Sequence, residues 1–182
     1  MKRKKLTASM IALVMSVSLP MTTYAANWYL EDGSVTVNAD NSGQTVTQGS
    51  TSTPDEAPVI TQRESSVETG NTIAISTSDN AAANVTIKDI NIKSSKDAID
   101  VTGSSSANIT LEGDNKIFSE TGSALHISDG NVTINGSGSL KAEIQDEPSG
   151  YNHNAKIGSH EKEDMSGSIH ITGDATVKTD DN

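Results

Sequence analysis

The chain has 182 residues, no cysteine and only 3% aromatic residues, so neither disulfides nor large aromatic side chains can hold its core together. Its 24 acidic residues outnumber its 13 basic residues, and this excess of negative charge argues against a nucleic-acid partner. Ser, Thr, Asn, Asp and Gly are frequent, with Val and Ile spaced between them, which is typical of short strands joined by turns.

Residues 1–25 have the features of a secretory signal peptide. A basic start at 2–5 is followed by an apolar run at 6–19 and by small residues that end at Ala25. The run is too short and too interrupted for a stable membrane span, which needs about 20 apolar residues. Cleavage would leave 9 basic and 24 acidic residues, a net charge of about −15. We therefore expect a secreted, extracellular or cell-surface-associated protein.

Residues 27–58 are predicted to form an N-terminal cap of two short strands and a polar loop. The strands flank the turn sequence Asp40–Gly43, and the loop is the low-complexity stretch 49–58. An open end of stacked strands needs a cover, and Trp28 is expected to lie over the end of the core. In the alternative interpretation, Trp28 and Tyr29 form an aromatic platform that stacks against sugars.

Residues 59–182 contain an internal repeat. An Asn-Val-Thr-Ile pattern begins at Asn84, returns at Asn108 and Asn131, and has a looser copy at Ser168. Short units that cannot bury an apolar face alone are typical of stacked solenoids, and no helix signal is present. We therefore predict an all-β fold, a short right-handed parallel β-helix of about three to five rungs.

Alternation within the repeats predicts which side chains face inward. Val85, Ile109 and Val132 lie at the same phase, so stacking the units would align them in one apolar column. The Asn residues that open the copies would bond to one another between rungs. The side chains expected on the exposed face are Thr86, Thr110 and Thr133, beside a stack of Asn84, Asn108 and Asn131.

The third unit contains an insertion at about 145–154, followed by a second polar stretch at 159–167. Long loops outside a solenoid often carry function. The Thr- and Asn-lined face and these loops are the candidate ligand surface, and we predict a non-catalytic carbohydrate-binding module whose partner is a polysaccharide or a cell-surface glycan. The alternative is a structural spacer or adhesin segment without a specific glycan. The predicted carbohydrate-binding residues are Thr86, Thr110, Thr133, Tyr151, Asn152 and His153.

A polysaccharide lyase or hydrolase is the less favoured alternative. A lyase uses an Arg or Lys base beside carboxylates that hold calcium, whereas the one Arg of the mature chain, Arg63, precedes the repeats. A hydrolase needs two carboxylates at a defined separation, and the one adjacent Asp pair is Asp180 and Asp181. No catalytic residue is predicted.

Calcium is the candidate cofactor, because hard cations prefer oxygen ligands and the predicted turns are acidic. Solvated turn acids without an ion are the alternative. The candidate calcium ligands are Asp89, Asp97, Asp100, Asp114 and Asp129. A second candidate site, for a transition metal, consists of the loop residues His153, His160, Glu161, Glu163 and Asp164.

Segments 28–37, 42–49 and 166–177, together with the Asn-Val-Thr-Ile units, resemble a family of secreted β-helix repeat proteins of gut and soil bacteria, which are labelled carbohydrate-binding domain-containing proteins. The resemblance implies a parallel β-helix that binds glycans without catalysis. Larger members carry a Gly-Ala-Gly-Ile-Gly-Gly element in each unit, which here reads Asn154–Ser159 with fewer glycines. Larger members also continue for more units, so we expect a fragment whose open last rung leads either to poor stability or to end-to-end self-association.

Overall fold

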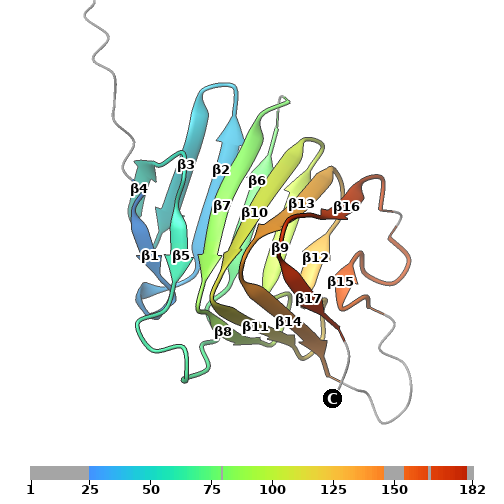
Figure 1. Ribbon diagram of the computed structural model, residues 1–182. Helices are drawn as coiled ribbons and strands as arrows, with labels where there is room; N and C mark the ends of the chain where they lie inside the picture. The colour runs from blue at the N-terminus through green and yellow to red at the C-terminus, as the bar shows by residue number, and fades with distance from the viewer. Residues whose placement is uncertain (1–24, 79, 146–153, 164, 180–182) are drawn as a thin grey trace, which may run out of the picture.

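The computed structural model describes residues 25–78, 80–145, 154–163 and 165–179, which form an all-β structure of three sheets (Figure 1). Within these residues the one helical element is the short 3-10 turn η1 (Leu30–Asp32), and no helix is long and apolar enough to cross a membrane. None of the three sheets, as far as they are described, closes on itself. The all-β prediction is therefore confirmed.

Sheet A consists of six strands, and every neighbouring pair in it is parallel. The Asn-Val-Thr-Ile copies lie in four of these strands, as their alternation predicts. In spatial order the strands are β1 (Asn27–Tyr29), β5 (Val59–Thr61), β7 (Ala82–Lys88), β10 (Ser106–Glu112), β13 (Asn131–Gly136) and β16 (Ser168–Ile171).

Sheet C consists of four parallel strands, each of which follows a sheet A strand after a short turn. In spatial order these are β8 (Asn91–Ser94), β11 (Asp114–Ser119), β14 (Ser139–Ile144) and β17 (Thr176–Lys178).

Sheet B has seven strands and includes the only antiparallel pairs among the described strands, β2 with β3 and β3 with β4. In spatial order its strands are β4 (Thr51–Pro54), β3 (Gly43–Gln48), β2 (Val35–Asp40), β6 (Ile73–Thr77), β9 (Ile99–Gly103), β12 (Leu125–Ile127) and β15 (Ile157–Gly158). From β7 onward the chain visits sheets A, C and B in turn and then returns to A. Each strand pairs in parallel with its counterpart one circuit later, an order compatible with a β-helix.

The core lies between the three sheets and consists mainly of branched aliphatic side chains. Val85, Ile109 and Val132 are all at most 3% exposed, so the inward phase predicted from alternation is confirmed. In the observed register the apolar column runs from Val85 through Ile109 and Ile134 and ends at Ile171 on the edge strand β16, whose side chain is 53% exposed. Burial of this column is thus complete in the middle strands and incomplete at the last one.

The predicted alignment of the third repeat copy is wrong by two residues. Thr133 lies opposite Asn108 rather than Thr110, and Val132 lies opposite Ala107 rather than Ile109. A strand that slides by two residues keeps every side chain on the same face, because the side-chain period of a strand is two. The hydrophobic pattern therefore determined the face of each residue but not its neighbour.

The predicted stack of asparagines forms only in part. The side-chain amide of Asn108 donates to Asn84 Oδ1 at 3.0 Å, as expected. Asn131, displaced by the two-residue slide, instead accepts a hydrogen bond of 2.7 Å from the Ser168 hydroxyl. On sheet A the Asn84–Asn108 pair is thus followed by an Asn131–Ser168 pair on the next two strands.

The N-terminal segment covers one end of the core. Strands β2 and β3 form the predicted hairpin around Asp40–Gly43, but 51–54 of the predicted loop forms the exposed edge strand β4. Trp28 is 9% exposed, and its Nε1 atom donates to Oδ2 of the buried Asp55 at 2.9 Å. Its ring belongs to the core cluster and is not available as a sugar platform.

Candidate functional site

A row of lysines crosses the outer face of sheet C. Lys116 lies between the inward-facing Asn115 and Ile117, so alternation directs its side chain to the outer face of β11. Lys116 is paired with Lys141 on β14, and Lys141 is paired with Lys178 on β17. Paired residues on neighbouring strands are about 4.8 Å apart, so the three lysines form one row across the sheet.

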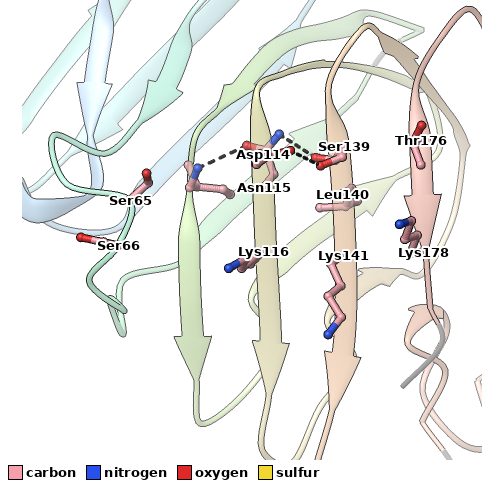
Figure 2. Close-up of a pocket in the computed structure, with 11 residues that line it drawn as sticks. Ser65, Ser66, Asp114, Asn115, Lys116, Ser139, Leu140, Lys141, Thr176 and Lys178 are labelled. Atoms are coloured by element: carbon pink, nitrogen blue, oxygen red, sulfur yellow. Dashed lines mark hydrogen bonds between the residues drawn. The ribbon is translucent and has the colours of Figure 1, made fainter. Parts of the chain in front are cut away.

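The lysine row lies along a groove of about 560 Å³ (Figure 2). Ser65 and Ser66 border the groove from the loop after β5, and Thr176 borders it from β17 at the other end. The groove thus extends across strands that are far apart in the sequence. The described residues that line it are Ser65, Ser66, Ile90, Asp114, Asn115, Lys116, Ser139, Leu140, Lys141, Thr176 and Lys178.

The charges in this groove differ from those of the whole chain. Lys141 is paired with Glu143 at 2.6 Å, whereas Lys116 and Lys178 form no ion pair within the described residues. Among the described residues that line the groove, the single carboxylate is that of Asp114, which accepts a 2.8 Å hydrogen bond from the Ser139 hydroxyl. With three amines and one carboxylate among its described residues, the groove is a cationic region on a chain whose net charge is −11.

A second candidate site lies on the outer face of sheet B, where two histidines stack. The rings of His126 and His160 have centroids 3.9 Å apart and planes inclined by 10°. His126 is on β12, while His160 follows the short strand β15. On β15 the residue paired with His126 is Gly158, which has no side chain and a φ of +136°, so the loop after it can fold back over the imidazole.

Three carboxylates surround the stacked rings. Asp100, paired with His126 in the sheet, lies 2.7 Å from the imidazole Nδ1 atom. Glu163 Oε2 lies 2.8 Å from His126 Nε2 and 3.7 Å from His160 Nδ1. Asp97 Oδ1 lies 2.7 Å from His160 Nε2 and also accepts the backbone N–H of Ser123 at 2.7 Å. We name these five side chains, Asp97, Asp100, His126, His160 and Glu163, the histidine–carboxylate cluster.

Opposing effects act on the protonation of His126. Burial by itself would lower its pKa, but hydrogen bonds with Asp100 and Glu163 outweigh that effect and raise the pKa above its ordinary value. The pKa of Glu163 is lowered, chiefly by the hydrogen bond to His126. The carboxylates of the cluster thus favour the protonated, positively charged form of His126.

The five candidate calcium ligands do not gather in one place. Asp97 and Asp100 are in the histidine–carboxylate cluster. Asp89 accepts the backbone N–H of Asp114 at 3.1 Å, and Asp129 accepts the Ser166 hydroxyl at 2.5 Å. Among the described residues, the one group of three or more potential metal ligands is Asp97, His126 and His160. Of this group, Asp97 was predicted as a calcium ligand and His160 as a transition-metal ligand, whereas His126 was not predicted.

The predicted carbohydrate-binding threonines lie on sheet A. Thr86 and Thr110 are paired neighbours, and Thr133 is shifted by two residues so that it lies opposite Asn108. The Thr110 hydroxyl donates to Asn135 Oδ1 at 2.9 Å and is therefore already engaged. Tyr151, Asn152 and His153, like Asp164 of the predicted transition-metal site, lie outside the described residues.

No protein-family model, no curated protein and no solved structure matches this chain. Its function is therefore inferred from its own residues and their geometry.

Proposed function

We propose that this chain is a secreted, short right-handed parallel β-helix that binds acidic polysaccharide, without catalysis, in the sheet C groove. The sequence of residues 1–25 supports secretion. The repeated A, C, B order of parallel strands supports the β-helix. Nearly all crossovers between parallel strands are right-handed, which supports the handedness.

The observation that carries the binding proposal is the line of Lys116, Lys141 and Lys178 along the groove. A polysaccharide is an extended ligand with regularly spaced groups, and a line of amines offers successive contacts to carboxylate or sulfate substituents. The whole chain is acidic, so on most of its surface a polyanion would need a metal bridge. The local excess of amines removes that need in the groove.

The hydroxyl groups of the groove complement its charge. Ser65, Ser66 and Thr176 can donate to or accept from sugar hydroxyls. A hydrolase needs a second carboxylate beside Asp114, and the described residues of the groove lining include none. Binding without bond cleavage is thus the function that these groups support best.

The experiment is affinity electrophoresis of the mature chain in gels that contain polygalacturonate or, for comparison, neutral hydroxyethyl cellulose. We expect retardation by the acidic polymer alone. The double variant Lys116→Gln with Lys141→Gln should bind about tenfold more weakly, because two exposed ion contacts of about 0.7 kcal/mol each amount to one factor of ten. Lys96→Gln, which removes the same kind of charge outside the groove, should lose little.

Three other results of this experiment would point to a different binding site or function. Retardation that the variant Thr86→Val with Thr110→Val abolishes, and that the lysine variant leaves intact, would move the site to sheet A. Absence of retardation in every gel, with and without calcium, would favour the spacer or adhesin function. Release of unsaturated or reducing sugars from the polymer would show an enzyme instead.

A further inference from the structure

We infer that Asp97, His126 and His160 form a binding site for a borderline transition-metal ion such as Zn²⁺. One potential ligand atom from each of these three residues lies within 4.8 Å of the other two. The inference is independent of glycan binding, because the cluster is on sheet B and the groove is on sheet C.

The chemistry of the donors selects the class of metal. Imidazole nitrogen and carboxylate oxygen are the usual ligands of Zn²⁺, Ni²⁺ and Co²⁺, whereas Ca²⁺ takes six to eight oxygen ligands. Zinc-bound nitrogen and oxygen atoms lie about 2.0–2.2 Å from the ion and, in the usual tetrahedral geometry, about 3.4 Å from one another. The three atoms lie within 4.8 Å of one another, so binding would require them to approach by up to about 1.4 Å, through movement of their side chains and of the loop that carries His160.

Burial distinguishes this cluster from a group of solvated acids. The His126 side chain is 8% exposed, and the loop that carries His160 and Glu163 covers it. Both ring nitrogens of His126 face carboxylates, so one carboxylate can orient the ring while the other nitrogen binds the ion. Asp100 is suited to the orienting role because its position next to His126 is fixed by strand pairing.

The charge of the cluster also favours a cation. Three carboxylates and two imidazoles carry a net negative charge when the imidazoles are neutral. Glu163 is 46% exposed and next to both rings, so it can supply a fourth ligand or give way to water. Asp97 and Asp100 also line a neighbouring hollow of about 340 Å³, which provides a path from solvent.

A metal ion here would join three circuits of the chain. Asp97 precedes β9, His126 is on β12 and His160 follows β15, so the ligands are 29 and 34 residues apart in sequence. Binding would therefore fix the loop 159–163 against sheet B and raise the stability of the folded chain, since the unfolded chain has no such site.

The test is titration of the untagged mature chain, after treatment with a chelator, with Zn²⁺ in a calorimeter and with Co²⁺ in a spectrophotometer. We expect one Zn²⁺ bound per chain and, with Co²⁺, visible absorption bands of a site with nitrogen ligands. His160→Asn should weaken Zn²⁺ binding at least tenfold. The matched control His170→Asn changes an exposed histidine on β16, outside the cluster, and should leave binding unchanged.

Three results would overturn the inference: no heat of Zn²⁺ binding, equal loss in His160→Asn and His170→Asn, or displacement of Zn²⁺ by equimolar Ca²⁺. If His126→Asn fails to fold, Asp97→Asn and His160→Asn still test the site, because both residues are outside the strands. Glycan retardation that persists while Zn²⁺ binding fails would disprove the metal site alone.

Discussion

Asp100 and His126 occupy paired positions on the neighbouring strands β9 and β12, and 2.7 Å separates Asp100 Oδ1 from His126 Nδ1. The carboxylate stabilises the protonated imidazole and helps to raise the pKa of His126. Asp100→Asn should therefore lower the pKa of His126, measured by NMR titration of the ring protons in metal-free protein. Asp174→Asn, at an exposed turn residue, is the control. An unchanged pKa in Asp100→Asn would contradict the assignment.

Stability of the metal-free protein should depend on pH through His126 and Glu163. The raised pKa of His126 gives a contribution that is fully present below its ordinary value of 6.5 and is lost as pH rises through the raised pKa. The lowered pKa of Glu163 gives a contribution that is present above 4.5 and is lost as pH falls through the lowered pKa. Both are complete between about pH 4.5 and 6.5.

The measurement is the urea midpoint of wild type and Glu163→Gln across this range, with a chelator present. The difference between the two midpoints should be largest between pH 4.5 and 6.5 and should shrink on either side. Glu161→Gln, an exposed neighbour, should show no such profile. If the difference between the two midpoints grew above pH 7, it would contradict the raised pKa of His126.

The end cap should depend on the buried carboxylate of Asp55. Its oxygens accept the Trp28 Nε1–H at 2.9 Å and the backbone N–H groups of Ala26 and Ala57 at 3.2 Å. Asp55→Ala should cost about 2–3 kcal/mol in free energy of unfolding, because it leaves buried donors without an acceptor. Trp28 is the only tryptophan, so its fluorescence reports on this end during urea unfolding. A loss no larger than that of Asp174→Ala would contradict the cap.

The apolar column gives a matched pair of core variants. Ile134 is paired with Ile109 and with Ile171, but it is fully buried whereas Ile171 is 53% exposed. Ile134→Ala should lower the free energy of unfolding by about 2–5 kcal/mol, and Ile171→Ala by about 1 kcal/mol or less. Denaturant unfolding of the two variants checks this. Equal losses would show that the last strand is covered as well as the middle ones.

Alternation predicted the inward and outward faces because the period of a strand is two, and burial of Val85, Ile109 and Val132 confirmed it. It could not predict the two-residue slide of β13, which depends on the turn after β12 and leaves the alternation unchanged. The slide also hid the lysine row. In the repeat, Ile117 corresponds to Leu140 and Val177. Lys141 and Lys178 follow their apolar residues, whereas Lys116 precedes Ile117, so Lys116 comes into register with the other two lysines only after the slide.

The histidine–carboxylate cluster was predictable only in part. The segments Ala98–Val101 and Ala124–Ile127 align as repeat copies, and this alignment already places Asp100 beside His126. His160 and Glu163 come from an insertion with no counterpart in the other units. Their position over His126 depends on how the loop after β15 folds, and an alignment of the repeats gives no information about that loop.

The binding proposal is tested most directly by NMR, with ¹⁵N-labelled mature chain titrated with an acidic oligosaccharide of galacturonate. The largest amide shifts should fall at Lys116, Lys141 and Lys178 and in the loop with Ser65 and Ser66, and they should diminish as salt is raised, since exposed charges are screened within about 8 Å at 0.15 M salt. Shifts centred on Thr86 and Thr110, or no shifts at millimolar ligand, would contradict binding in the sheet C groove.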